Sequence, residues 1–239
     1  MNLLIAIDDT DNDVSIGTGR LARLLAGELE RKRLGSRTSV TRHQLLMHSD
    51  IPYTSHNSCA CIEMEAADHN VKEIAEFAKG FLFENYHEGA NPGLCVVAQG
   101  AVPEKLGWFG YRVQREVIAI EEARTLGEKL GLLAWWHGET GRGCIGAMAG
   151  VGLRSSGMDG RFIALEGIRE LRGTITVGAL LGASGIKQVM SVSGKALQHD
   201  EIIDTQDWVR PTLCEGQPVL FVREEESVWR SAEKRKRKA

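Results

Sequence analysis

The sequence has few cysteines, and they lack metal-binding spacing. Its five cysteines form no C-x-x-C motif and are odd in number, which argues against a disulfide framework and a zinc ribbon. Long apolar runs are also missing, since no stretch approaches the length that spans a bilayer. The N-terminus has neither the basic region nor the cleavage site of a secretory signal. We therefore expect a cytoplasmic protein with no membrane association.

The chain does contain enough apolar material for a core. Its 239 residues are 43% hydrophobic, which suits one large domain or two small ones. The formal net charge of −3 is unevenly spread. Residues 230–239 hold six basic side chains and one acidic one, which leaves about −8 on the rest. An acidic body is a poor general nucleic-acid binder, and we interpret 229–239 as a disordered basic tail rather than an RNA tether.

Apolar periodicity predicts alternating strands and helices. Short apolar runs bounded by turn residues indicate strands, and apolar residues at helical spacing indicate helices. The predicted strands are 3–7, 37–45, 58–65, 94–98, 161–166, 186–192 and 218–222, and the predicted helices are 20–34, 66–86, 103–109, 115–130 and 145–153. This order predicts an α/β (α+β) protein with a mixed sheet covered by helices.

Glycine becomes frequent in the second half of the chain, in 138–157 and 173–185. No flexible linker precedes this change, so we place a domain boundary near Leu132 and expect two rigidly packed domains with a cleft between them. Residues 135–137, with the sequence WWH, are interpreted as a buried edge of the second domain rather than a base-stacking surface.

Three aspartates directly follow the first predicted strand. They are Asp8, Asp9 and Asp11. Carboxylates so close together repel one another, so each raises the cost of ionising the others. A cation removes this cost, and Mg²⁺ suits the place because it takes one or two protein carboxylates and leaves room for water and phosphates. The aspartates therefore predict a Mg²⁺ site, in preference to a turn built from Asp and Asn.

A glycine turn then leads into a predicted helix. Gly17 and Gly19 flank Thr18, and the helix 20–34 follows. Glycine allows close backbone approach, and a helix N-terminus directs amide groups and a positive dipole end at an anion. The turn therefore predicts a phosphate site beside the aspartates, in which Thr18 donates to a phosphate or receives one.

Two other interpretations use the same residues. Residues 17–22 match the G-x-G-x-x-A form of a dinucleotide-binding fingerprint, but an acidic loop separates them from the strand that should precede them directly. Asp9 and Asp11 have the spacing of the nucleophile and acid of an aspartyl-phosphate enzyme. No convincing partner set for that chemistry follows in the sequence.

The remaining candidates are better explained by packing. Cys59 and Cys61 share one face of a predicted strand and read as buried small residues rather than as a metal pair. His43, His48 and His56 lie close in sequence, but a metal cluster would need a fourth ligand.

Several motifs, taken in order, resemble those of one family. They are IDDTD at 7–11, the glycine-threonine turn, Arg42 followed by DIPYT at 50–54, GRGCIGAMAGVG at 141–152 and GQPVLF at 216–221. Together they resemble the archaeal agmatinylcytidine synthetases, which join agmatine to the wobble cytidine of an isoleucine tRNA. The resemblance covers nearly the whole chain. It implies a kinase-like domain that binds ATP and Mg²⁺ over 1–132 and a ferredoxin-like domain over 133–228, without the oligonucleotide-binding and zinc-ribbon domains.

The resemblance implies an ATP-dependent ligase or phosphotransferase. In this family ATP activates a carbonyl as a phosphorylated intermediate, and a primary amine such as agmatine displaces the phosphate. The implied catalytic residues are Asp8, Asp9, Asp11 and Thr18, and the same three aspartates are the metal ligands. The implied ATP and phosphate contacts are Thr10, Gly17, Gly19, Arg42 and His56, and the implied amine contacts are Arg142 and Gly143. Charge complementarity adds Glu139 or Glu166 as an acidic partner for a cationic amine.

Two segments depart from the family pattern. The family has Cys-Thr-Thr where this chain has Gly17-Thr18-Gly19, which puts phosphorylation of Thr18 in doubt. A basic segment of the family is replaced by TSHNSC at 54–59, where His56 is the titratable group, so a weaker grip on phosphate follows.

The sequence thus predicts phosphoryl activation of a carbonyl-type oxygen followed by attack of an amine. The acceptor is either a tRNA, held through a separate partner protein, or a small molecule. Two alternatives stay open: a small-molecule kinase or ligase that does not act on tRNA, and a non-catalytic protein that binds a nucleotide or an amine. The oligomeric state is not predicted.

Overall fold

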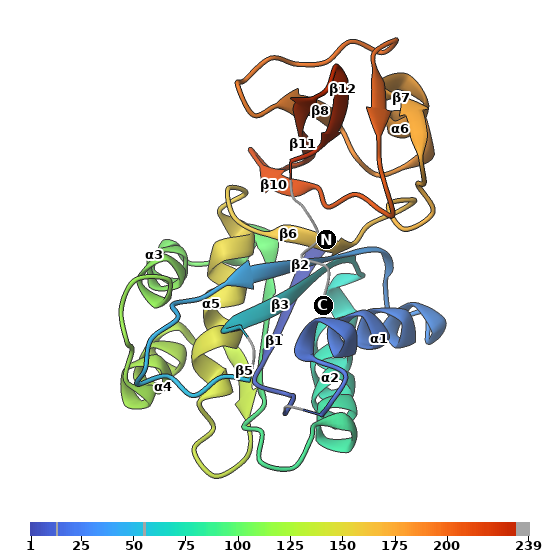
Figure 1. Cartoon of the computed structure of the whole chain (residues 1–239). Helices are drawn as coiled ribbons and strands as arrows, with labels where there is room; N and C mark the ends of the chain where they lie inside the picture. Colours follow the sequence, from blue (N-terminus) through green and yellow to red (C-terminus); the bar gives the residue numbers. More distant parts are fainter. Residues whose placement is uncertain (13, 55, 233–239) are drawn as a thin grey trace. The chain divides into compact units, whose positions relative to one another are not determined.

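A computed structural model describes residues 1–12, 14–54 and 56–232 of the chain (Figure 1). The chain divides into two compact units, Met1–Ser156 and Gly157–Ala239, and each has its own cluster of buried apolar side chains. Strands and helices alternate through most of the first unit. The α/β class predicted from the sequence is confirmed.

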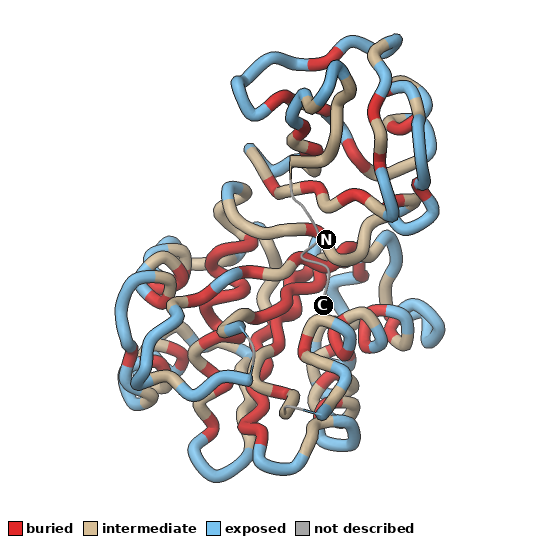
Figure 2. The backbone as a smooth tube through the Cα atoms, in the orientation of Figure 1, coloured by how far each residue is buried: buried red, intermediate tan, exposed pale blue. Residues whose placement is uncertain are grey.

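Unit 1 is built on five strands in the order β5-β4-β1-β3-β2. They are β1 (Asn2–Asp8), β2 (Ser36–Gln44), β3 (Ser58–Glu65), β4 (Gly93–Ala98) and β5 (Leu133–Trp136). Each neighbouring pair within this unit is antiparallel. The central strand β1 is fully buried from Leu3 to Ile7, as its unbroken apolar run predicts (Figure 2).

Helices cover both faces of this sheet (Figure 1). On one face lie α1 (Thr18–Arg31) and α2 (Val71–Asn85), and on the other lie α3 (Glu104–Val113), α4 (Ile120–Leu130) and α5 (Gly143–Ser155). The short helices η1 (Asp68–Asn70) and η2 (Gln99–Ala101) join them to strands. Successive strand residues point to opposite faces, and Leu4 and Ala6 pack in the same cluster as α5. Asp8 therefore ends β1 on the α5 face.

Helix α5 explains why the units divide later than expected. Nearly all of its side chains are buried, and it packs on β1, β3 and β4. A helix that is apolar on all sides belongs inside a core, so this glycine-rich segment completes unit 1. The boundary follows Ser156 rather than Leu132. Trp135 and Trp136 accordingly lie half-buried on β5 of unit 1, not on an edge of the second domain.

Unit 2 consists mainly of short strands. Its elements are β6 (Arg161–Ala164), β7 (Thr174–Thr176), α6 (Val177–Ala183), β8 (Gln188–Ser191), β9 (Ile202–Asp204), β10 (Thr212–Cys214), β11 (Gln217–Glu225) and β12 (Val228–Ser231). Strands β6-β10-β11-β12-β9-β7 are neighbours in that order, and β8 pairs with β11. The parallel pairs are β8 with β11 and β9 with β12, so the mixed character of the strand pairing comes from this unit.

The last strand extends into the expected tail. Trp229 packs on the core of unit 2, and Arg230 pairs with Asp204 at 3.4 Å and with Glu225 at 3.5 Å. These contacts order 229–231, so the prediction of a disordered tail from 229 is wrong for these residues. The rest of the predicted tail, 233–239, lies outside the described residues.

Three smaller features of the fold bear on the sequence predictions: the start of α4, the cysteines and the lengths of the helices. The helix predicted over 115–130 begins at Ile120, because the amide groups of Arg115 and Glu116 bond to the end of α3. Cys59 and Cys61 are buried as predicted, and none of the five cysteines, all described, forms a disulfide. In the described part of the chain, no helix has the length and apolar character needed to cross a membrane.

Candidate functional site

A pocket of about 560 Å³ opens in unit 1 at the C-terminal end of β1. The β1–α1 loop, the segment between β2 and β3, the α3–α4 connection and the start of α5 line it. Its lining includes the charged residues Asp8, Asp9, Asp11 and Arg142. Apolar lining residues are Leu45, Ile51, Pro52, Tyr53, Val113, Val117, Ile118, Ile120 and Ile145. The pocket therefore combines charged groups with apolar surface, as ligand sites commonly do.

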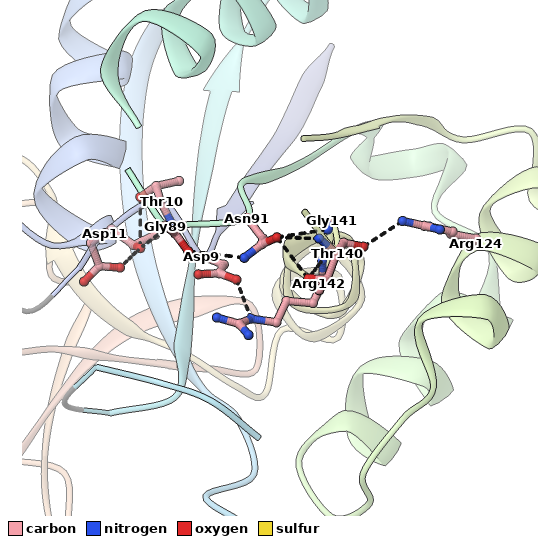
Figure 3. Close-up of polar contacts among 10 residues, drawn as sticks. Asp9, Thr10, Asp11, Gly89, Asn91, Arg124, Thr140, Gly141 and Arg142 are labelled. Carbon is pink, nitrogen blue, oxygen red and sulfur yellow. Dashed lines mark hydrogen bonds and ion pairs between the residues drawn. The ribbon is translucent and has the colours of Figure 1, made fainter. Parts of the chain in front are cut away.

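An ion pair joins the two sequence motifs across this pocket. The Nε of Arg142 donates to Oδ2 of Asp9 at 2.7 Å (Figure 3). Asp9 has a φ of 50°, a left-handed conformation that is unusual for a residue other than glycine and often marks functional sites. Burial raises the pKa of Asp9, while the Arg142 guanidinium and the amide of Asn91 oppose the rise. This half-buried pair fixes the guanidinium beside the aspartate loop.

Asp8 lies against the first turns of α5. A Cβ atom on Gly146 would overlap the carboxylate of Asp8, so this glycine makes room for the acid. Burial, together with the charges of Asp9 and Asp11, raises the pKa of Asp8 to about 8. A nearby cation would favour the ionised form.

The third aspartate is part of a hydroxyl network. Thr18 donates to Oδ1 of Asp11 at 2.7 Å and accepts from the Thr10 hydroxyl at 3.0 Å. Thr54 donates to the other oxygen of Asp11 at 3.4 Å. Thr18 is buried and begins α1, and the preceding Gly17 has a φ of 81° that favours glycine. The network fixes the loop against the helix N-terminus.

The donor set fits Mg²⁺ held by fewer than three carboxylates. Residues 1–12, 14–54 and 56–232 contain no group of three or more His, Cys, Asp or Glu side chains that could hold one metal ion. This rules out Asp8, Asp9 and Asp11 as a ready three-carboxylate cage, and Asp9 is already paired with Arg142. Among the described residues of the loop, Asp8 and Asp11 are the carboxylates left for a cation, a number typical of Mg²⁺ sites that also use water and phosphate oxygens. The same finding argues against a metal cluster of His43, His48 and His56.

The pocket brings together part of the predicted set. Asp8, Asp9, Asp11, Thr18, His56 and Arg142 line it. Thr10 and Gly17 lie in the β1–α1 loop, and Gly19 and Gly143 lie in the first turns of α1 and α5, but none of the four is among the described lining residues. Gly143 serves packing, since a Cβ atom there would meet the backbone of Asn91 and Gly93.

Three predicted residues lie elsewhere. Arg42 is on β2, is not among the lining residues, and donates from its Nε to Oγ of the lining residue Ser58 at 2.8 Å. Glu139 is exposed and is not a lining residue, and Glu166 is exposed in unit 2. Both glutamates were chosen by charge complementarity, which carries no information on position. The pocket instead has Asp50, Glu88 and Glu116 at its walls.

Sequence reasoning also missed Asn91, whose side-chain oxygen accepts hydrogen bonds from the turn before Arg142 (Figure 3). Its Asn-Pro-Gly context indicated only a turn. The role of Gly146 could have been predicted from the sequence, because glycines recur at helical spacing in 141–152. Small residues at that spacing allow a helix to approach a strand closely.

Part of this chain is similar to proteins of one kind. No family model matches the sequence. The isoleucine-tRNA 2-agmatinylcytidine synthetase TiaS of Pyrococcus horikoshii is 32% identical over 156 residues, which are 64% of this chain and 36% of that protein. A crystal structure of TiaS in complex with its isoleucine tRNA and ATP matches with 29% identity and a TM-score of 0.55, covering 64% of this chain and 36% of the other.

A TiaS complex with the same tRNA, AMPCPP and agmatine matches with 28% identity and a TM-score of 0.53, covering 63% of this chain and 36% of the other. The match is shorter than the nearly complete coverage expected from the motifs, and the chain spans about a third of the length of these relatives. Over the matched stretch, the resemblance is confirmed: the chain is similar to the TiaS 2-agmatinylcytidine synthetases.

Proposed function

We propose that the pocket of unit 1 binds ATP with Mg²⁺ and that the chain is an ATP-dependent ligase of the TiaS type. The observation that carries this proposal is the ion pair between Asp9 and Arg142, which unites the two most informative motifs at one pocket. The acidic loop and the α1 N-terminus supply groups for a cation and for phosphate oxygens. Relatives crystallised with ATP or AMPCPP support the same ligand class.

Each group has a defined part in this proposal. Asp8 and Asp11 hold Mg²⁺, which neutralises phosphate charge when bound. Arg142, kept in place by Asp9, presents its remaining N–H groups to a phosphate. The Thr18 hydroxyl donates to Asp11 in the structure, so it must give up that bond before it contacts or receives a phosphate.

The reaction that follows is amine ligation. A carbonyl-type oxygen of the acceptor is phosphorylated by ATP, and the nitrogen of a primary amine then attacks the activated carbon. A C–N bond forms, the C–O bond breaks, and phosphate leaves with the oxygen. We assign the cationic amine to the carboxylates that line the pocket, Asp50, Glu88 and Glu116, because Glu139 and Glu166 are not among them.

The test combines binding with product analysis. Calorimetry with ATP, Mg²⁺ and agmatine, together with measurement of AMP, ADP and phosphate, should show binding and turnover that Asp8→Asn and Asp9→Asn abolish. Asp68→Asn, at an exposed position on η1, is the matched control and should behave as the unaltered chain. Transfer of labelled agmatine to an isoleucine tRNA transcript identifies a tRNA acceptor, whereas turnover without RNA identifies a small-molecule acceptor.

A non-catalytic nucleotide or amine sensor is the second candidate. It is favoured by the excess of carboxylates around the pocket, where Arg142 is the fixed cation among the described lining residues. Tight binding of ATP or agmatine with no product under any of these conditions would support the sensor and contradict the ligase.

A further inference from the structure

Asn91 accepts an unusual number of hydrogen bonds for one side chain. It lies between α2 and β4 and is 5% exposed. Its Oδ1 accepts from the Thr140 amide at 2.7 Å, from the Thr140 hydroxyl at 3.0 Å and from the Gly141 amide at 3.2 Å. Gly141 has a φ of 65° and leads directly to Arg142. One amide oxygen thus holds the turn from which the Arg142 side chain leaves (Figure 3).

The backbone of Asn91 bonds to the start of α5 and to Asp9. Its carbonyl accepts from the Gly143 amide at 3.0 Å, which places the start of α5. Its amide bonds to the carboxylate of Asp9. Asn91 therefore contacts the chain on either side of Arg142 as well as the partner of that arginine.

Arg124 supports the turn from the opposite side. Its Nη2 donates to the Thr140 carbonyl at 2.8 Å, and its guanidinium lies over the Trp136 ring at 5.2 Å. This support does not replace Asn91, because it engages an acceptor of the turn rather than its amide donors.

We infer that Asn91 is a positioning residue that holds Arg142 against Asp9. Without its side-chain oxygen, the Thr140 and Gly141 amides lose their acceptor, and the unpaired Gly141 amide is costly because its hydrogen bond is buried. The turn then shifts to satisfy them, and the Arg142 guanidinium moves with it. The role of Asn91 in holding Arg142 does not depend on a ligand, whereas its effect on ATP binding rests on the proposed function.

The direct test measures the Arg142 Nε proton by NMR in the ligand-free chain. Asn91→Ala should speed its exchange with solvent about tenfold, as expected for a loss of about 1.4 kcal/mol of protection. Asn91→Asp keeps acceptor oxygens for both amides and should restore most of the protection. Asn85→Ala, at the exposed end of α2, is the control and should leave the signal unchanged.

Unchanged exchange in a folded Asn91→Ala chain would overturn the inference. If that variant does not fold, Asn91→Ser takes its place, since a serine hydroxyl is too short to reach all three donors. The same exchange measurement then decides the question.

Binding of AMPCPP with Mg²⁺ gives a second readout. In a chain that keeps Arg142, Asn91→Ala should weaken this binding about tenfold. In an Arg142→Ala background, Asn91→Ala should have no further effect, because a residue that acts through another loses its effect when that partner is gone. Equal losses in both backgrounds would contradict the positioning role. If the unaltered chain does not bind AMPCPP, the proposed function fails, while the exchange measurement still decides the role of Asn91.

Discussion

Among single residues, Asp8 has the environment that makes the chain sensitive to pH. Its pKa is about 8 in the folded chain against an ordinary value of 3.8, so the folded state holds this proton more tightly than the unfolded state. The stability from the neutral acid is fully present below about pH 4 and is lost as pH rises to about 8. Each pKa unit corresponds to about 1.4 kcal/mol.

The first prediction compares the ligand-free chain with Asp8→Asn in thermal unfolding between pH 5 and 9, with a chelator present. The asparagine cannot ionise, so the stability advantage of the variant should grow by about 1.4 kcal/mol per pH unit from pH 5 to pH 8 and level off at several kcal/mol above pH 8, because the variant avoids the buried charge. Parallel curves over the whole range would show that Asp8 is not buried as described.

The second prediction concerns Mg²⁺ at the same residue. At pH 8 a bound cation favours ionised Asp8, so Mg²⁺ at 100 times its dissociation constant should stabilise the folded chain by about 2.7 kcal/mol and release about half a proton, since Asp8 is half ionised at that pH. Unfolding midpoints and the buffer dependence of the calorimetric heat measure the two effects. Asp8→Asn should lose both, and removal of Mg²⁺ by a chelator should reverse the gain.

For single residues, the sequence predicted a place in the pocket when both the residue type and its place at the end of a strand pointed there. Asp8, Asp9 and Asp11 follow an apolar run, and the end of a buried strand is a definite place in a fold, which is why all three line one pocket. Glu139 and Glu166 were predicted from charge alone, and neither lies there. Asn91 has no sequence signal of its own, because its role depends on a turn nearly fifty residues later in the chain.

At the scale of elements, the close approach of α5 to β1 is what shapes the pocket. Gly146 lies against Asp8, and Gly150 lies against Ala6 and Cys59. Side chains at these positions would push the helix away from the strand or displace the aspartate.

The third prediction uses this contact. Gly146→Ala should destabilise the chain by about 1–3 kcal/mol, the usual cost of overpacking, and should abolish the Mg²⁺ response by displacing Asp8. Gly27→Ala in α1 is the matched control, because a Cβ atom there meets nothing within 4 Å. It should stabilise the chain by about 0.5–1 kcal/mol through helix propensity. Chemical denaturation of both variants measures the difference, and similar effects in the two would remove the special role of Gly146.

Elements were predictable from local pattern, while their grouping was not. The periodicity of α1 and the run of β1 are local properties of the chain, and both elements occur where predicted. The composition of α5 suggested a new domain because glycine content changes there. In the structure the same glycines are needed because α5 crosses the sheet of unit 1 at short range, and no local pattern states which sheet a helix will cover.

At the scale of the whole molecule, the pocket belongs to one unit. All described lining residues fall within Met1–Ser156, and that unit has its own core of buried apolar residues from β1, α3 and α5. The matched stretch of about 64% of the chain is similar in length to this unit. The unit is thus large enough to bury a core of its own.

The fourth prediction is that a fragment of residues 1–156 folds and keeps the pocket. It should unfold in one cooperative transition, because its core is contained within it. It should bind Mg²⁺ with AMPCPP within about threefold of the full chain, a difference of under 1 kcal/mol. Circular dichroism and calorimetry measure the two properties, and the fragment carrying Asp8→Asn is the control. A folded fragment that does not bind, beside a full chain that does, would show that residues beyond 156 contribute to the ligand site.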